Sequence, residues 1–452
     1  MFRYTGPLAS GSSPLPAATP RICCLDLDTF FVSVERTLDA SLEGKPVIVG
    51  GRPGQRGVVT ACSYEVREFG VRSGMSLTQA AQLAPRAIFL PVRHGTYGDY
   101  AKRVVHIAER FSPVIRVASI DEMFIDFRGS ERLYHAPDDA TDDETIERVV
   151  WQLTDAIAGE LGLPSSAGIA TSKVIAKVAS GLAKPRGVLM VPAGQETELL
   201  APLPVRKFPG IGPVAAKKLE AAGILTLGQL ADMPYNKLTH VFGAWTGNVY
   251  RGVHGHGSAD MGPARRAFRE HDPSGETVGS ISNERTFRED EGDPTVLDSM
   301  LCALCERVSW RARKRGVKAR TVTLKLRYAD FVTLSRSKTT SPTHSEKHVL
   351  GIVRELYRRA NTTTGKIRLL GVALTNLGPG EQLNLFENQD RLHTVVDHVR
   401  ARFGFDAVRL AAASTREVDQ GNGHGEHRTW GGKGTHDTTT RADPTTDPTT
   451  PP

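Results

Sequence analysis

The chain has 452 residues, a formal net charge of +7, and hydrophobic and charged contents of 39% and 24%, which are typical of a globular protein of about two to four domains. No apolar run approaches the ~20 residues that span a bilayer, and the Gly-, Ser- and Pro-rich stretch 1–20 lacks the pattern of a secretory signal, so we expect a cytoplasmic protein without membrane contact. The odd count of five cysteines favours reduced thiols. The pair Cys302 and Cys305 lacks the second pair that a zinc site needs.

The chain divides into blocks whose residue patterns differ, and each block predicts one kind of structure. In chain order these are a disordered leader over 1–20, an α+β region over 21–190, short helices over 191–256, amphipathic strands and helices over 265–378, a Gly/Pro break with a C-terminal helix over 379–414, and a disordered tail over 415–452. The tail has almost no large apolar residue and therefore cannot bury enough surface to fold.

Acidic residues follow two apolar runs that predict buried strands. Arg21–Leu25 leads into Asp26–Asp28, and Val114–Ala118 leads into Ser119–Glu122. Unpaired buried carboxylates are costly, and the usual compensation is a hard cation such as Mg²⁺ held by oxygen ligands. Three carboxylates that reach one point suit two Mg²⁺ ions acting on phosphate, as in polymerases and nucleases. Taken alone, each acid is more simply a strand-end charge that faces water, and we expect this of Asp28.

A helix-hairpin-helix pattern spans Phe208–Leu219. Its turn at Gly210 and Gly212 opens a helix whose first amides are unpaired, and such amides accept a DNA phosphate without reading the base sequence. The flanking prolines and nearby lysines such as Lys217 strengthen a Gly-x-Gly signal that is weak alone.

Positive charge is concentrated in the segment 301–368. This segment holds 17 Lys and Arg against four acids, a net charge of +13, so that the rest of the chain carries −6. A basic segment within a folded region indicates contact with a phosphate backbone, and Arg313, Lys314 and Arg315 are its candidate contacts. The alternative is a solvated basic face without a partner.

Taken together, these motifs resemble the Y-family DNA polymerases of the DinB or DNA polymerase IV type. The resemblance covers roughly residues 21–412 and rests on Asp26–Glu35, Cys62–Met75, Ser119–Glu122, Ala183–Pro185 and the helix-hairpin-helix. It implies an α+β right-hand fold with a ferredoxin-like palm, small fingers, a helical thumb and an α/β little finger. The implied domains are a palm over 21–29 and 93–190, fingers over 30–92, a thumb over 191–256 and a little finger over 265–378.

The resemblance also implies the metal ligands. Asp26, Asp121 and Glu122 would bind two Mg²⁺ ions, or Mn²⁺, with the Leu27 carbonyl as a further ligand. One ion would lower the pKa of the primer 3′-hydroxyl, and the other would hold the triphosphate. Because neighbours on a straight strand face opposite sides, Asp121 and Glu122 would need a strand end or hairpin turn between them.

The resemblance also implies which residues contact the incoming nucleotide. Phe31 matches the steric gate, a ring under the sugar that leaves no room for a 2′-hydroxyl. Tyr64, Arg67 and Lys184 match contacts to the dNTP triphosphate, for which an Arg fork and a Lys point charge are suited. Relatives often carry a Thr where this chain has Ala61, so that hydroxyl would be lost or supplied by Thr60 or Ser63.

A further motif follows the Gly378–Gly380 break. The segment 382–386 resembles a bacterial sliding-clamp-binding peptide, which binds as an extended strand. Gln382 would supply hydrogen bonds, and the apolar side chains would enter a pocket of the clamp; these are Leu383, Leu385 and Phe386. The alternative is a short amphipathic strand of the little finger.

The expected function is a template-directed, error-prone DNA polymerase that copies past damaged bases. It would add dNTPs to the primer of a primer-template DNA, as a monomer, without a proofreading exonuclease. Two alternatives remain open: a non-catalytic relative that binds DNA and the clamp, and a nucleotide cyclase, which shares a two-metal palm.

Overall fold

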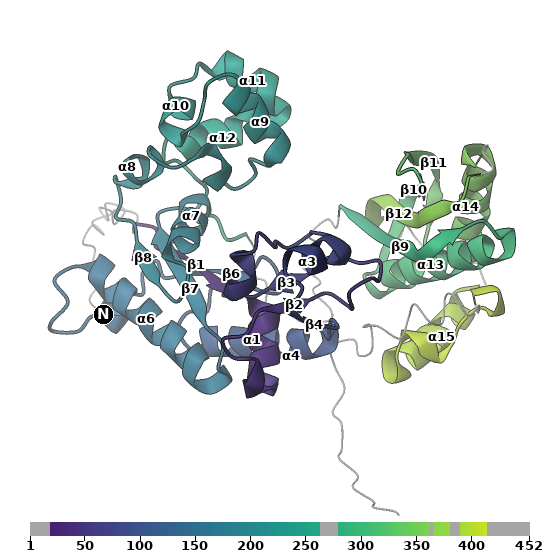
Figure 1. Ribbon diagram of the computed structural model, residues 1–452, viewed down its shortest axis with the longest axis horizontal. Helices are drawn as coiled ribbons and strands as arrows, with labels where there is room; N and C mark the ends of the chain where they lie inside the picture. Colours follow the sequence, from purple (N-terminus) through teal and green to yellow (C-terminus); the bar gives the residue numbers. More distant parts are fainter. Residues whose placement is uncertain (1–18, 263–278, 362–364, 380–388, 414–452) are drawn as a thin grey trace, which may run out of the picture. The chain divides into compact units, whose positions relative to one another are not determined.

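In the computed structural model of the protein, the described residues are 19–262, 279–361, 365–379 and 389–413 (Figure 1). They form two compact units, one made of the residues up to Gly279 with Thr286–Asp290, the other of Ser280–Arg285 and the residues from Glu291 onward. Among the helices of these described ranges, none is long and apolar enough to cross a membrane.

A five-stranded sheet forms the centre of the first unit. Its order is β5 (Ile115–Val117), β6 (Glu122–Asp126), β1 (Ile22–Leu27), β7 (Ser165–Ala170) and β8 (Val188–Met190). β1 pairs antiparallel with both β6 and β7. β1 extends two residues beyond the predicted Leu25, so that Asp26 lies within the strand rather than after it.

Alternate residues of β1 enter two different cores. Cys23, Leu25 and Leu27 pack with α1 (Phe30–Leu38), α4 (His94–Ala108) and α6 (Asp142–Leu161). Ile22 and Cys24 pack on the opposite face, with α7 (Lys173–Ala183). Because successive strand residues face opposite sides, β1 packs apolar side chains against helices on both faces of the sheet. The core that α1 enters also includes Val47 and Val49 of the smaller sheet described below, so α1 lies between the two sheets' apolar residues.

Gly168 on β7 allows α7 to lie directly against the sheet. A Cβ at this position would come within 2.2 Å of the Ala176 carbonyl oxygen and of the Ser180 amide. This close approach matters because α7 carries two lysines of the site described below.

A smaller three-stranded sheet has the order β3 (Ala61–Cys62), β2 (Val47–Val49) and β4 (Ile88–Leu90). Two short helices, α2 (Tyr64–Arg67) and α3 (Leu77–Leu83), belong to the same region. Its separate core includes Ile48, Cys62 and Leu77.

The predicted short helices of 191–256 are present. They are α8 (Glu196–Leu200), α9 (Pro213–Ala221), α10 (Leu227–Ala231), α11 (Tyr235–Phe242) and α12 (Thr246–Val253). The turn before α9 requires glycine at Gly210, which has φ of 93°. A Cβ there would also come within 1.8 Å of the Trp245 ring.

The second unit is a four-stranded sheet with helices. The strand order is β11 (Thr333–Thr343), β10 (Val317–Tyr328), β12 (Ile367–Pro379) and β9 (Ser280–Glu291), of which Thr286–Asp290 groups with the first unit. The two long helices are α13 (Pro294–Lys314) and α14 (Glu346–Ala360). Alternate β10 residues, Val322, Leu324 and Leu326, are buried, as the predicted amphipathic strand requires.

Buried charges attach the C-terminal helix α15 (Gln389–Phe403) to this unit. Arg400 is 1% exposed and forms an ion pair with Glu306 of α13, and it lies 3.8 Å from a Glu346 oxygen of α14. The helix lies within the predicted range 379–414 and ends at Phe403, because Gly404 turns the chain with φ of 97°.

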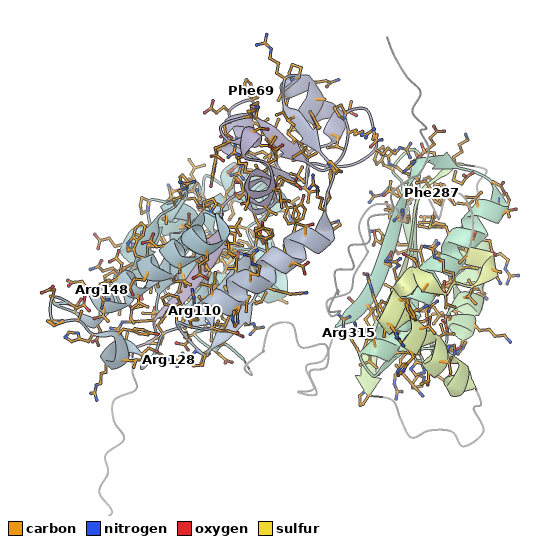
Figure 2. All side chains as sticks on the ribbon, turned by 90° about the horizontal axis from the view of Figure 1, so that it is seen from below. Phe69, Arg110, Arg128, Arg148, Phe287 and Arg315 are labelled. Atoms are coloured by element: carbon orange, nitrogen blue, oxygen red, sulfur yellow. The ribbon has the colours of Figure 1, made fainter. Side chains whose placement is uncertain are left out.

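Arg313 belongs to the same charged network. Its guanidinium donates to Asp397 of α15 at 2.7 Å and to Glu346 at 3.1 Å, and its side chain is 8% exposed. These two carboxylates already pair with Arg313 inside the fold, which makes it a weaker candidate for a DNA contact than its neighbours. Arg315, labelled in Figure 2, is exposed just beyond the end of α13, and Lys314 lies over the Trp310 ring at 5.7 Å.

Candidate active site

The pairing of β1 with β6 brings the predicted carboxylates together. Asp26 lies opposite Glu122 in the register of the two strands, and the Leu27 amide donates to the Asp121 carbonyl at 2.9 Å. Asp121 occupies the hairpin turn between β5 and β6, where the Ser119 amide donates to the Glu122 carbonyl at 3.1 Å. The predicted turn is thus present, and it places two consecutive acids beside a third.

Each of the two strand carboxylates is paired with a lysine. Lys177 donates to Glu122 at 2.5 Å, and Lys184 donates to Asp26. Lys177 lies within α7 and Lys184 caps its C-terminus, so the two are seven residues, about two turns, apart. Lys177 was not among the predicted site residues, although this helical spacing from Lys184 is a signal that could have found it.

Burial and neighbouring charges act against each other at this cluster. Burial raises the pKa of Asp26, the Lys184 ammonium opposes that shift, and the charges of Asp121 and Glu122 add to it. Burial alone would lower the pKa of Lys177, but the hydrogen bond and charge of Glu122 outweigh it and the pKa is raised. The carboxylates therefore repel one another, and the lysines offset that repulsion.

Asp28 does not face water, and that expectation is wrong. It is 1% exposed, and its carboxylate accepts hydrogen bonds from the Ser166 hydroxyl at 2.8 Å, the Arg186 amide at 2.9 Å and the Tyr64 hydroxyl at 3.2 Å. These donors come from β7, from the loop after α7 and from α2. Asp28 consequently ties the end of β1 to three other parts of the site.

The predicted steric gate rests on a second aromatic ring. Phe31 is half-buried and stacks on Tyr97, with ring centroids 4.1 Å apart and planes 15° apart. Tyr97 is fully buried, and its hydroxyl donates to Glu35 at 2.7 Å, which also lies 3.3 Å from Arg93. Tyr97 thus holds Phe31 in place; no sequence pattern pairs these two residues, which lie on α1 and α4.

The predicted triphosphate contacts on α2 touch each other. The Arg67 guanidinium lies over the Tyr64 ring, 4.7 Å from its centroid. Burial raises the pKa of Tyr64 to about 12, and the Asp28 charge adds to that shift. The buried Ser63 hydroxyl accepts from the Val47 amide at 3.1 Å. Thr60 is therefore the better substitute for the hydroxyl absent at Ala61.

The donor set at this strand pair suits a hard divalent ion. Three carboxylates with nearby backbone oxygens are the ligands that Mg²⁺ and Mn²⁺ prefer. Within the ranges that the structure describes, however, no three His, Cys, Asp or Glu side chains form a group that could hold a metal ion. Glu122 and Asp26 bond to lysines, and Asp121 accepts from the Ser119 hydroxyl.

The other predicted contacts belong to other elements of the chain. Gly212 precedes α9, Pro213 is its first residue, and Lys217 on the same helix is exposed. Part of the basic segment is neutralised within the second unit, as by the ion pair of Lys325 with Glu284 at 2.8 Å. The clamp-binding prediction, Gln382–Phe386, lies outside the described residues.

Comparison with known proteins agrees with these observations. The impB/mucB/samB family matches residues 25–181, its C-terminal domain matches residues 278–385, and the IMS family HHH motif matches residues 196–224. DNA polymerase IV of Dehalococcoides mccartyi (strain CBDB1) is 37% identical over 395 residues, 86% of this chain and 96% of that protein. DNA polymerase IV of Streptomyces coelicolor is 38% identical over 376 residues, 81% of this chain and 73% of that protein.

Solved structures share the fold. A Y-family DNA polymerase chimera of Dbh and Dpo4 aligns with a TM-score of 0.65 and 24% identity, over 80% of this chain and 100% of that chain. The fold and these matches define a DNA-directed DNA polymerase of the Y-family type. The chain belongs to the DNA polymerase IV family. The predicted family and α+β fold class are confirmed, and the cyclase alternative is excluded; Y-family polymerases generally use divalent metal ions.

Proposed function

We propose that the protein is a low-fidelity DNA polymerase that copies past damaged template bases by two-metal phosphoryl transfer. The observation that carries the proposal is the meeting of Asp26, Asp121 and Glu122 at the β1 and β6 strand pair. The five-stranded sheet would be the palm and the three-stranded sheet the fingers. The α8–α12 region would be the thumb, and the second unit, from Ser280, the little finger.

The carboxylates would hold two divalent ions, Mg²⁺ or Mn²⁺, with the Leu27 carbonyl. When bound, the ions would activate the primer 3′-hydroxyl and neutralise the triphosphate. Lys184 lies 3.7 Å from Asp28 and Arg67 lies over the Tyr64 ring, and we assign both cations, with Tyr64, to the dNTP phosphates. Asp28 would orient Tyr64, because its carboxylate accepts the Tyr64 hydroxyl at 3.2 Å.

Phe31 would exclude ribonucleotides. A ring acts as a steric gate only if it cannot move aside when a 2′-hydroxyl approaches. The 4.1 Å stack on the buried Tyr97 supports this role, since the ring behind Phe31 is itself held by Glu35.

Contacts to the DNA backbone would come from both units. The exposed N-terminus of α9, with Gly210, Gly212 and Lys217 nearby, suits a phosphate without base readout. In the second unit Lys314 and Arg315 remain candidates. We also propose that Gln382–Phe386 recruits the enzyme to a sliding clamp, on the strength of the motif alone.

Primer extension with Mg²⁺ and dNTPs tests the proposal directly. The enzyme should extend a primer on an undamaged template and also past one abasic site, with no 3′→5′ degradation of a mismatched primer. The Asp121→Asn variant, nearly isosteric with the native residue, is the matched control and should do neither. Extension that always stops before the lesion would refute the translesion role, and failure to extend any primer would refute catalysis.

A further inference from the structure

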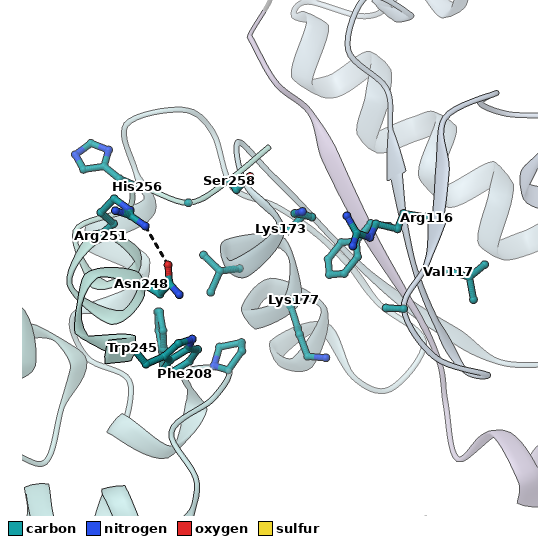
Figure 3. A pocket seen from close by; sticks show the side chains of 15 residues that line it. Arg116, Val117, Lys173, Lys177, Phe208, Trp245, Asn248, Arg251, His256 and Ser258 are labelled. Atoms are coloured by element: carbon teal, nitrogen blue, oxygen red, sulfur yellow. Dashed lines mark hydrogen bonds between the residues drawn. The ribbon is translucent and has the colours of Figure 1, made fainter. Parts of the chain in front are cut away.

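A cationic cavity of about 730 Å³ lies beside the carboxylates in the first unit. Figure 3 shows it between β5, β6 and α7 on one side and the region around α12 on the other. Its charged lining residues are all basic: Arg116, Lys173, Lys177 and Arg251. Aromatic rings complete the wall, namely Phe124, Phe208 and Trp245.

The positive charges of this cavity are crowded. Burial lowers the pKa of Lys173, the neighbouring Arg116 charge lowers it further, and the Asp260 charge opposes both. Lys173 donates to the Asp260 carbonyl and Arg116 to the Met261 carbonyl at 3.1 Å, so both are held by neutral oxygens. Basic groups that are held largely by neutral oxygens, next to aromatic rings, suit a polyanion with apolar parts, which describes a nucleic acid strand.

Among the residues that the structure describes, Lys177 is the side chain that the cavity shares with the carboxylate cluster. It lines the cavity, and its ammonium bonds to Glu122 at 2.5 Å. A divalent ion at Glu122 would be repelled by this ammonium at such short range. Glu122 can therefore act as a full metal ligand only after Lys177 has moved to another partner.

We propose that Lys177 is a positioning residue that couples DNA binding to metal binding. In the structure its ammonium bonds to Glu122, and we expect the same contact in the enzyme without DNA. A phosphodiester of primer-template DNA in the cationic cavity offers Lys177 an alternative anion, and its departure frees Glu122 for the divalent ion. The inference rests on the proposed function, since the cavity occupant is the DNA that the polymerase copies.

The coupling has a thermodynamic consequence. If DNA removes a competitor of the metal, DNA strengthens metal binding, and the metal strengthens DNA binding by the same factor. Couplings of this kind typically reach roughly 5- to 150-fold. The arrangement would keep the free enzyme poorly loaded with metal and complete the site only on a primer-template.

Mn²⁺ titration followed by electron paramagnetic resonance measures the coupling without chemistry. Full-length enzyme is titrated alone and with saturating primer-template that ends in a dideoxynucleotide, without dNTP, and DNA alone is titrated in parallel for subtraction. For the wild type, DNA should strengthen Mn²⁺ binding roughly tenfold. For Lys177→Gln, the free enzyme should already bind Mn²⁺ as tightly as the DNA complex does.

Two further variants separate positioning from general charge. Lys173→Gln removes a cation from the same cavity but none from Glu122, so the effect of DNA on Mn²⁺ affinity should persist. Lys177→Arg keeps the cation and should restore at least part of the effect. Thermal unfolding of each variant shows that it is folded.

The outcomes separate this inference from the proposed function. If Lys177→Gln leaves the Mn²⁺ affinity of the free enzyme unchanged, or keeps the full effect of DNA, the inference is wrong even though the wild type extends primers. If the wild type extends primers but DNA does not change its Mn²⁺ affinity, the inference is also wrong. A wild type that neither binds primer-template nor extends it overturns both.

Discussion

At the scale of single residues, the site consists of charged groups held by specific partners. Asp26 and Glu122 bond to Lys184 and Lys177, and Asp28 accepts three hydrogen bonds in a buried position. Removing a charge from such a group changes chemistry without removing much packing. Conservative amide substitutions are therefore the informative ones here.

Amide substitutions of the carboxylates should abolish nucleotide addition. Asp26→Asn, Asp121→Asn and Glu122→Gln should each reduce the rate of single-nucleotide insertion by at least about 1000-fold. Primer-template affinity should change little, because phosphate contacts elsewhere supply most of it. Rapid-quench insertion kinetics and fluorescence anisotropy measure the two quantities. Near-normal insertion by any variant would remove that residue from the mechanism.

Phe31→Ala should open the site to ribonucleotides. We expect the ratio of rNTP to dNTP incorporation efficiency to rise by about 100-fold, since exclusion of one added hydroxyl is worth about that much. Tyr97→Phe keeps the supporting ring and loses only its hydrogen bond to Glu35, so its ratio should stay close to that of the wild type. A ratio in Phe31→Ala equal to that of the wild type would assign the gate to another residue.

At the scale of elements, the helices α7 and α15 each form ion pairs with other elements of the chain. α7 lies against the sheet at Gly168 and presents two lysines to the carboxylates. α15 is attached to α13 and α14 by the buried pair of Arg400 with Glu306 and by Arg313 with Asp397. A buried ion pair adds little net stability, but breaking one side of it is costly.

Arg400→Met should destabilise the second unit. It leaves Glu306, which is 2% exposed, without its cation, and we expect the free energy of unfolding to fall by about 3–5 kcal/mol. Urea unfolding followed by circular dichroism measures the change. The double variant Arg400→Met with Glu306→Leu removes both charges and should recover much of the loss. No recovery would mean that packing, not the unpaired charge, causes it.

The helix-hairpin-helix prediction is tested by salt dependence. Lys217→Gln should weaken binding to all primer-templates alike and reduce the slope of log K against log[salt] by about 0.9, the value for one lost phosphate contact. Arg206→Gln is a matched control, because that exposed cation already pairs with Glu220 of α9 at 2.9 Å and its loss should leave the slope unchanged. If the Lys217→Gln variant has the same salt slope as the wild type, α9 does not contact DNA.

At the scale of the whole molecule, two compact units are joined by one polypeptide. The proposed polymerase chemistry lies in the first unit, and the clamp motif lies between β12 and α15 of the second. Loss of recruitment should therefore be separable from loss of catalysis.

Leu385→Ala with Phe386→Ala should leave extension on a bare primer intact and remove stimulation by the cognate sliding clamp. Each side chain would lose about 1.5–3 kcal/mol of apolar burial, which a tether of several kcal/mol cannot absorb. Primer extension with and without the clamp measures this, with Asn384→Ala as the control that should stay stimulated. Full stimulation of the double variant would show that the clamp contact lies elsewhere.

Much of the protein follows from local sequence. The strand alternation of β1, the glycine turn before α9 and the acidic motifs are short-range patterns, and together with the family resemblance they led to the polymerase class and to Asp26, Asp121 and Glu122. Such patterns predict local structure well because backbone geometry sets which residues of a strand or turn share a face.

Only the tertiary structure decided which partners the charged and aromatic groups have. The carboxylates of Asp28 and Glu122 meet Ser166 and Lys177 across more than fifty residues of sequence, Phe31 meets Tyr97, and Arg313 meets Asp397. A charged residue looks the same in the sequence whether its side chain faces water or a buried counter-ion. Its role therefore depends on burial and on contacts that chain folding alone brings about.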